Sequence, residues 1–259
     1  MRTTALVTAV LGGAALLVGL AAAPATAATA ATAAAAPAAH PAPAHGSFAP
    51  FHGQLIHSHR VGGTFNQNGY NWSGYAATGS GFTSVSANWV EPTVTCNSAN
   101  DLYAPWVGID GYGSNSVEQT GVATDCSSGR PVYQAWYEMY PANPVYYSNA
   151  VSGGDSFTAS VTRSGTTYTL KITDNTKGWT KTTSKSYRGS NASAEFILES
   201  PTAAYPRFGT VTFTNALING KALSSFNPVA LDASNGGGYE DHTSAISGGT
   251  TFSVTYERE

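Results

Sequence analysis

The stretch from residue 104 to residue 140 carries side chains suited to a binding site, in a strand-like pattern. Apolar and polar residues alternate along three short runs, so each run has one apolar face and one face rich in polar and aromatic groups. A face of carboxylates, amides and indoles suits a groove better than a core. The residues that we expect to form the floor of this groove are Trp106, Asp110, Trp136, Glu138 and Tyr140.

A second candidate for chemistry is Glu195, which lies in the middle of the apolar run 193–199. On a strand, the large apolar neighbours would share one face and Glu195 would lie on the other. A lone carboxylate at such a position needs water, a partner or a raised pKa. The pattern alone also permits a solvent-facing glutamate on the outer surface of a sheet. The same two readings apply to Glu118 and Glu138.

The composition of the chain after residue 69 limits the type of chemistry. His242 is the only histidine in this part, and no serine there stands in a Gly-x-Ser-x-Gly elbow, so a serine–histidine mechanism lacks support. We expect the only two cysteines, Cys96 and Cys126, to form a disulfide, which excludes a cysteine nucleophile. With one histidine and no Cys-x-x-Cys spacing, we expect no metal site and no cofactor. Carboxylates remain as the catalytic candidates.

The N-terminal part of the chain has the organisation of a secretory leader. Residues 1–27 combine a basic start, an apolar run and a small-residue ending, which is typical of a cleaved signal peptide. An uncleaved membrane anchor is the alternative. We therefore expect a secreted, extracellular protein that has no membrane association after the leader is removed. In that compartment the Cys96–Cys126 bridge would close a loop of about thirty residues and stabilise the fold by roughly 3–4 kcal/mol.

Residues 28–68 are expected to form an unfolded linker followed by a pro-segment. Residues 28–44 are rich in alanine and proline, and five of the six histidines precede residue 60. The remaining chain, 69–259, holds all fifteen acidic residues and ten of the twelve basic ones, so its formal charge is about −5. A cationic pro-segment docked on an acidic groove would explain this asymmetry, and an unselected solvated tail is the alternative. We expect a monomer. We expect no nucleic-acid partner, because no basic face is evident.

Strand-like patterns follow one another from residue 70 to residue 256, with no helical periodicity over ten positions. A hairpin is expected around the dipeptide Ser164-Gly165. Only 10% of the residues are charged, and Thr, Ser, Tyr and Gly are abundant, which fits antiparallel sheets stacked on each other. We therefore predict an all-β fold, an antiparallel β-sandwich. Besides the three central runs, the expected strands are 70–77, 82–90, 156–163, 166–174, 179–187, 192–199, 209–214 and 250–256.

Five segments of the chain resemble, in order, the motifs of the glutamic peptidase (eqolisin) family. They are Trp106-Val-Gly-Ile-Asp-Gly111, Gln119-Thr-Gly-Val122, Ala135-Trp-Tyr-Glu-Met-Tyr-Pro141, Asn191-Ala-Ser-Ala-Glu-Phe-Ile197 and Phe208-Gly-Thr-Val-Thr-Phe-Thr-Asn-Ala216. Each motif alone is weak, but five in register are specific, and they span roughly residues 71–256. The resemblance implies a lectin-like sandwich of two large antiparallel sheets, with the active site on the concave face of one sheet.

The resemblance also implies that Gln119 and Glu195 are the catalytic pair. Glu195 as a carboxylate would take a proton from a water molecule held between the two side chains, and that water would attack the scissile carbonyl. The Gln119 amide would stabilise the oxyanion, for which it needs no titrating proton. Protonated Glu195 would then return its proton to the departing amine.

The expected groove residues match substrate-binding positions of the family. By this resemblance Trp106 and Trp136 would contact apolar parts of a polypeptide, Tyr140 would form a hydrogen-bonding rim, and the charges of Asp110 and Glu138 would tune the pKa of the catalytic glutamate. One position departs from the family pattern. Ala123 stands where fungal members usually carry an aspartate, so the pH optimum does not follow from the resemblance.

The function best supported by the sequence is a secreted, acid-active endopeptidase. One alternative is a jelly-roll glycoside hydrolase that uses two of Glu118, Glu138 and Glu195, with carboxyl groups about 5 Å apart if it retains configuration. The other is a non-catalytic carbohydrate-binding sandwich that uses aromatic platforms such as Trp136.

Overall fold

The computed structural model describes residues 66–235 and 237–259. The predicted signal peptide, the linker and nearly all of the predicted pro-segment lie outside these residues. Residues 66–68 belong to the folded domain, because Gln67 and Asn68 pair in parallel with Leu231 and Asp232. The domain thus starts slightly before the predicted boundary. Within the described ranges, no helix has the length and apolar character needed to cross a membrane.

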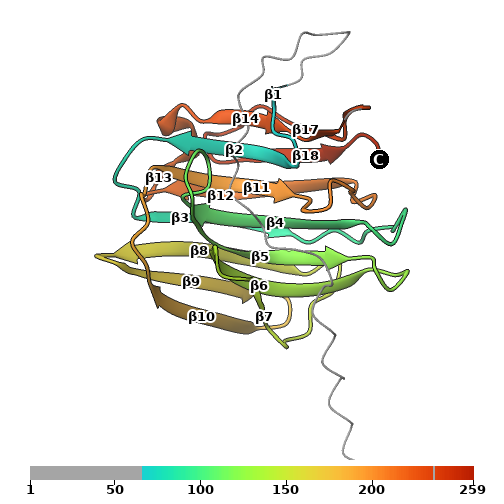
Figure 1. Ribbon diagram of the computed structural model, residues 1–259, viewed down its shortest axis with the longest axis horizontal. Coiled ribbons are helices and arrows are strands. Elements are labelled where there is room, and N and C mark those ends of the chain that lie inside the picture. The colour runs from blue at the N-terminus through green and yellow to red at the C-terminus, as the bar shows by residue number, and fades with distance from the viewer. Residues whose placement is uncertain (1–65, 236) are drawn as a thin grey trace, which may run out of the picture. The chain divides into compact units, whose positions relative to one another are not determined.

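Two large β-sheets stack face to face, with their strands nearly aligned (Figure 1). The first sheet, in spatial order, contains β1 (Gln67–Asn68), β14 (Val229–Asp232), β2 (Trp72–Thr78), β11 (Ser193–Glu199), β4 (Leu102–Ile109), β5 (Val117–Asp125), β6 (Val132–Tyr140) and β7 (Val145–Tyr146). The second contains β10 (Trp179–Ser186), β9 (Thr167–Asp174), β8 (Ser156–Ser164), β3 (Ser84–Val90), β12 (Thr210–Ile218), β18 (Phe252–Tyr256) and β17 (Asp241–Thr243), with β13 (Lys221–Ala222) on β12. The predicted all-β sandwich is confirmed.

The short elements are where the sequence patterns were least informative. β14 and β17 have only four and three residues, too few for alternation to be recognised, and neither was predicted. The predicted hairpin turn is wrong by one residue, because Ser164 pairs with Thr167 and leaves Gly165 and Thr166 in the turn. Gly165 has φ 61°, in the left-handed region that glycine adopts without the steric cost of a side chain. The remaining elements are β15 (Ser234–Asn235), β16 (Gly238–Tyr239) and a 3₁₀ turn at Leu223–Phe226.

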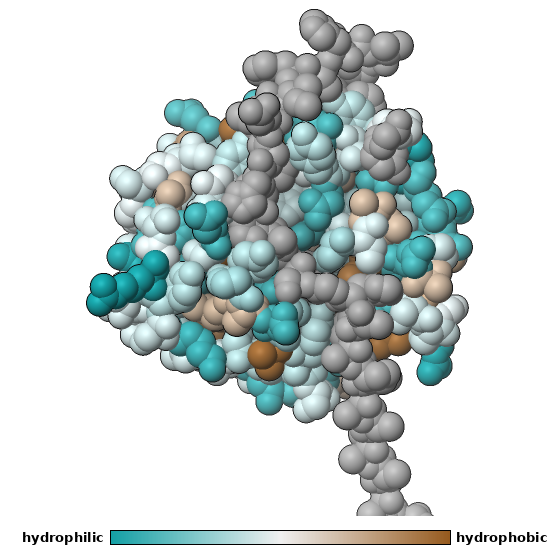
Figure 2. Space-filling model, in the orientation of Figure 1, coloured by the Kyte–Doolittle hydropathy of each residue, from teal (hydrophilic) through white to brown (hydrophobic). Residues whose placement is uncertain are grey.

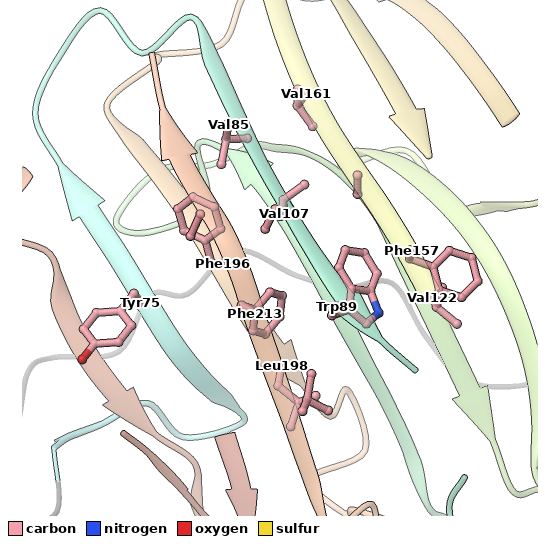
Figure 3. Close-up of a cluster of buried hydrophobic side chains, with 14 of the residues drawn as sticks. Tyr75, Val85, Trp89, Val107, Val122, Phe157, Val161, Phe196, Leu198 and Phe213 are labelled. Atoms are coloured by element: carbon pink, nitrogen blue, oxygen red, sulfur yellow. The ribbon is translucent and has the colours of Figure 1, made fainter. Parts of the chain in front are cut away.

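The main core lies between the two sheets (Figure 3). Apolar side chains at alternate positions of both sheets meet there, as period-two patterning requires. Trp89 stacks on Phe157 with ring centroids 5.9 Å apart, and Phe213 stacks on Phe252 at 5.0 Å. Each fully buried large side chain stabilises the fold by roughly 2–3 kcal/mol. The labelled members in Figure 3 come from strands of both sheets, so this core holds the two layers together.

Large apolar side chains are scarce on the described surface. Tyr70, Val90 and Val145 are the exposed ones among the described residues. On the face shown in Figure 2, hydrophobic colour occurs only in small separate spots. Among the described residues, the large apolar side chains therefore lie mainly inside the domain.

The predicted disulfide is present. Cys96 and Cys126 are bonded, with Cα atoms 5.7 Å apart and a sequence separation of 30. The bridge ties the loop after β3 to the end of β5. It therefore anchors the end of β5, a central strand of the first sheet.

One carboxyl group, that of Glu91, is buried inside the sandwich. Its Oε1 accepts hydrogen bonds from the Tyr103 hydroxyl at 2.8 Å and the Thr124 hydroxyl at 2.9 Å, and Oε2 accepts one from Trp89 Nε1 at 3.3 Å. Burial raises the pKa of Glu91 from 4.5 to about 7, although these donors oppose the shift. Glu91 is therefore neutral in the folded protein at acid pH.

We expect the domain to be more stable at pH 4 than at pH 8. The native state keeps a proton on Glu91 that the unfolded chain releases above pH 4.5, so the stabilisation is complete below 4.5 and is lost as the pH rises through 7. From Glu91 alone the loss is about 3 kcal/mol, or roughly 5–10 °C in Tm. Thermal unfolding followed by circular dichroism measures it. Glu91→Gln, neutral at every pH, should flatten the curve, and a Tm that climbs steadily from pH 4 to pH 8 would contradict the expectation.

Candidate active site

The two predicted catalytic residues lie in one row across the middle of the first sheet. Glu195 on β11 pairs with Gly108 on β4. Gly108 in turn pairs with Gln119 on β5, and Gln119 pairs with Glu138 on β6. Adjacent strands are about 4.8 Å apart, so the backbones that carry Glu195 and Gln119 are separated by about 10 Å. That spacing allows the two side chains to face each other across one intervening residue.

The intervening residue, Gly108, has neighbours so close that only glycine fits between the two side chains. A Cβ atom added to Gly108 would lie 2.9 Å from Cζ3 of Trp106 and 3.2 Å from Cβ of Gln119. These distances are shorter than ordinary packing contacts, so a side chain would displace its neighbours. Sequence reasoning missed this residue. The available signal was a glycine inside a strand, which often marks a close approach by a ligand.

The next row of the same face is aromatic. Trp106 pairs with Ile197 on one side and with Gly121 on the other, and Gly121 pairs with Trp136. These tryptophans belong to an apolar cluster separate from the core between the sheets. A Cβ on Gly121 would lie 2.7 Å from Cβ of Trp106, so this position is also closed to larger residues. Trp106 and Trp136 thus lie on the face that carries Glu195 and Gln119, and their contact with substrate stays a prediction.

Glu195 is fully buried at this face. Its Oε1 accepts a hydrogen bond from the backbone N–H of Tyr112 at 3.2 Å, in the loop between β4 and β5. Its Oε2 has no hydrogen-bond partner among the described residues. Burial raises the pKa of Glu195 well above 4.5, and the nearby charges of Asp110 and Glu118 raise it further. A carboxyl group in this setting exchanges a proton more readily near neutrality than an exposed glutamate does.

The Gln119 amide has a defined orientation. Its Nε2 donates a hydrogen bond to Oε2 of Glu138 at 2.8 Å, and both residues are fully buried. Because a carboxylate only accepts hydrogen bonds, this contact requires the nitrogen and not the oxygen of the amide to face Glu138. By accepting this hydrogen bond, Glu138 fixes the orientation of the Gln119 side chain. Burial is the main cause that raises the pKa of Glu199, and the charge of Glu138 raises it further.

Asp110 does not lie where alternation predicted it. Extending the pattern of Trp106 and Gly108 put Asp110 on the same face, but β4 ends at Ile109 and Asp110 has φ 63°. This left-handed turn breaks the period of two. The Asp110 carboxylate accepts hydrogen bonds from the backbone N–H groups of Asn191 and Ala192, at 2.8 and 2.9 Å. Its predicted place on the groove face is therefore wrong, while its predicted part in substrate binding and in tuning the catalytic glutamate stays a prediction.

Glu199 is a second residue that sequence reasoning missed. It is fully buried, and its Oε2 accepts a hydrogen bond from Nε1 of Trp106 at 3.1 Å. Trp106 also packs edge-on against Trp72, with centroids 5.0 Å apart. Glu199 follows Glu195 by four positions on the same strand, so period two places both on one face. Burial raises the pKa of Glu199 well above 4.5.

Tyr140 and Ala123, the two remaining positions that the family resemblance singled out, lie on the face of the sheet that carries Glu195 and Gln119. Tyr140 is partly buried and packs against the apolar cluster. Ala123 belongs to the cluster and pairs with Gln134, so no carboxylate occupies that position.

The geometry does not favour the paired-glutamate alternative. Glu118 neighbours Gln119 on a strand, so its side chain points to the other face of the sheet. Glu138 and Glu195 share a face, but β4 and β5 separate their strands. Three strand spacings put their backbones about 14 Å apart, and Gln119 lies between them. This row therefore does not provide the two carboxyl groups about 5 Å apart that a retaining glycosidase needs.

Comparison with known proteins assigns the chain to a family. The model of the Peptidase A4 family matches residues 70–256, and the chain belongs to this family of glutamic peptidases, the eqolisins. The resemblance recognised from five motifs is thereby confirmed, and the carbohydrate-directed alternatives are set aside.

Named relatives and solved structures agree with this assignment. Aspergillopepsin-2 of Aspergillus niger is 28% identical over 231 residues, which cover 76% of this chain and 81% of that protein. Scytalidopepsin B of Scytalidium lignicola is 35% identical over 137 residues, covering 50% of this chain and 51% of that one. The crystal structure of scytalido-glutamic peptidase with a transition state analog inhibitor is 27% identical, with a TM-score of 0.65, and covers 73% of this chain and 98% of that chain.

Proposed function

We propose that this protein is a secreted endopeptidase that cleaves polypeptides with a water molecule activated by Glu195 and Gln119. The observation that carries the proposal is the row in which Gly108 separates these two side chains. Family membership supports the reaction class, and a related structure holds a peptide, Ala-Ile-His. Extracellular action fits the disulfide, because such bridges persist in oxidising compartments.

The first step is attack by water. Ionised Glu195 takes a proton from a water molecule above Gly108, and the oxygen of that water forms a bond to the scissile carbonyl carbon. The carbonyl π electrons move to oxygen and create a negative charge. An N–H of the Gln119 amide donates to this oxyanion, while the other N–H holds Glu138. The amide suits this role because it remains a donor at every pH.

The second step breaks the peptide bond. The tetrahedral intermediate collapses, the C–N bond breaks, and protonated Glu195 gives its proton to the departing nitrogen. The carboxyl group returns to its ionised form, so the cycle closes without a covalent enzyme intermediate. Trp106 and Trp136 border the row and would contact apolar substrate side chains, with Tyr140 at the edge of the same face.

We expect activity on the acid side of neutrality. Base catalysis needs ionised Glu195, whose pKa burial raises well above 4.5, so the rate should rise with pH as this group loses its proton. Ionisation of other buried carboxyl groups then weakens the fold, since the pKa of Glu91 is raised to about 7 and that of Glu118 to about 8. Ala123 stands where fungal members usually carry an aspartate, so this position adds no further charge to the site. These opposing effects give a bell-shaped profile with its maximum at weakly acid pH.

Protein hydrolysis by the purified full-length chain, after any self-processing, tests the function. We expect cleavage of a denatured protein substrate between pH 3 and pH 7, with new termini identified by mass spectrometry. Inhibitors of serine, cysteine and metallopeptidases should leave the rate unchanged, since the mechanism uses none of their groups. The absence of new termini over this whole range, or complete inhibition by a chelator, would contradict the proposal.

A further inference from the structure

Three side-chain oxygens converge at one point near the end of the sandwich. A Cβ atom placed on Gly189 would lie 2.5 Å from Oδ2 of Asp110, 2.5 Å from the Tyr168 hydroxyl and 3.0 Å from Oε2 of Glu118. Glu118 and Asp110 are fully buried, and so is Tyr168. The three residues come from β5, the turn after β4, and β9. Neither Glu118 nor Tyr168 takes part in the mechanism proposed above.

Asp110 links this cluster to the strand that carries Glu195. Its carboxylate accepts the backbone N–H groups of Asn191 and Ala192, and its own N–H donates to the carbonyl of Ser193 at 3.0 Å. The Tyr168 hydroxyl donates to Oδ1 of Asn191 at 2.7 Å. Asn191, Ala192 and Ser193, which lead into β11, are therefore all hydrogen-bonded to Asp110. The position of Asp110 thus controls where β11 begins, two residues before Glu195.

The two neighbouring carboxyl groups cannot both be charged without a large cost, because both are buried. The Asp110 carboxyl group accepts two backbone N–H bonds, one on each oxygen. The Glu118 carboxyl group interacts with the side chains of Asp110, Ser116 and Tyr168. Because both oxygens of Asp110 already act as acceptors, Glu118 is the member of the pair that can donate a hydrogen bond. Burial, followed by the Asp110 charge, raises the pKa of Glu118 to about 8.

The other ionisable groups that face Glu118 do not change this assignment. The Tyr168 hydroxyl from β9 is neutral, because burial and the two carboxyl groups raise its pKa. The pKa of Glu195 on β11 is raised by burial and further by Asp110 and Glu118. Arg163 on β8 acts on Tyr168 and lowers the pKa of its hydroxyl.

We propose that Glu118 is a positioning residue, which in its protonated form donates a hydrogen bond within the Asp110–Tyr168 cluster and so holds the start of β11 and, through it, Glu195. This inference rests on the proposed function, because it assigns Glu118 a part in presenting the proposed base. Loss of the proton would set two negative charges side by side in a dry site and push Asp110 away from its backbone partners. Glu118 thus contributes to the upper pH limit of activity.

Substitutions at Glu118 in the full-length protein test this inference. Glu118→Gln retains a neutral donor, so kcat at pH 5 should stay within about threefold of wild type, and the decline toward pH 8 should be weaker. Glu118→Leu removes the donor, and kcat should fall by roughly 10- to 100-fold at pH 5, because misplacing a catalytic group by about 1 Å has effects of that order. KM should change little, since Glu118 faces away from the groove. Glu257→Gln, on an exposed side chain, is the control.

Two outcomes would overturn the inference. One is an unchanged kcat in Glu118→Leu, and the other is a decline toward pH 8 in Glu118→Gln as steep as in wild type. The second comparison holds even if the leucine variant does not fold. The difference in Tm between pH 5 and pH 8 gives a readout independent of catalysis, and it should shrink in Glu118→Gln. If wild type cleaves no peptide bond but this difference shrinks, the proposed function fails while the role of Glu118 in holding β11 stands.

Discussion

Glu195→Gln should lower kcat by about 10⁴-fold and leave the domain folded. We expect a loss at the upper end of the rate contribution of general acid–base catalysis, because Glu195 serves first as base and then as acid. Glutamine has the same shape but accepts no proton, so both steps lose their proton carrier. Since burial already favours the neutral form of Glu195, the variant should be at least as stable as wild type at pH 7. The measurements are kcat on a peptide substrate from pH 3 to pH 8 and Tm at each pH.

The partner residue allows a sharper version of the same test. Gln119→Ala should lower kcat by about 10²- to 10³-fold, the usual effect of removing one oxyanion donor. Gln119→Glu keeps a donor only while the new carboxyl group is protonated, so its remaining activity should be confined to low pH. Glu257→Gln is exposed and should behave as wild type. Full activity of Glu195→Gln or Gln119→Ala would refute the mechanism.

Gly108→Ala should reduce kcat/KM by roughly 10²-fold, although it adds a single methyl group. The methyl would lie 2.9 Å from Cζ3 of Trp106 and 3.2 Å from Cβ of Gln119, between the two reacting side chains. Either the water is excluded or Gln119 and Trp106 shift by several tenths of an ångström, and catalysis is sensitive to such displacements. The larger side chain of Gly108→Val should abolish measurable activity. The backbone of Gly108 is not left-handed, so the cost is steric.

A matched substitution separates the site effect from a general effect of replacing glycine. Gly79→Ala puts a Cβ 3.3 Å from Cζ of Phe82, at an exposed position after β2, and its activity should equal that of wild type. Tm and binding of a peptide-based transition-state analogue should be measured for both variants. Loss of analogue binding at an unchanged Tm identifies a blocked site. Wild-type activity of Gly108→Ala would show that the space above Gly108 is not where the water reacts.

The resolved pKa shifts of carboxyl groups in the described part of the chain are all upward. The affected residues are Glu91, Glu118, Asp174, Glu195, Glu199 and Asp241. In each case burial is the largest cause. Their protons stabilise the fold at acid pH, which is also the range in which we expect catalysis. The same burial that adjusts the proposed base therefore makes the scaffold suited to acid conditions.

Much of the candidate site could be inferred from local pattern. Alternation correctly put Glu195 opposite the apolar face of its strand, and it separated Gln119 from Glu118. The composition pointed to a sandwich, and the lone cysteine pair to a disulfide. These inferences succeed because side-chain direction in an extended strand depends only on the parity of the position. Asp110 was misplaced for the same reason, since parity fails once the backbone turns at φ 63°.

What the sequence by itself determined is which face of its strand each residue lies on, wherever the backbone stays extended. Only the tertiary structure decided which strands are neighbours. β11 enters the sheet between β2 and β4, and this places Glu195 beside Gly108 and across from Gln119. Parity carries no information about that order, because strand pairing depends on how all the apolar faces are buried together. The row through Gly108, the amide held by Glu138 and the cluster of Glu118, Asp110 and Tyr168 all follow from the order of the strands.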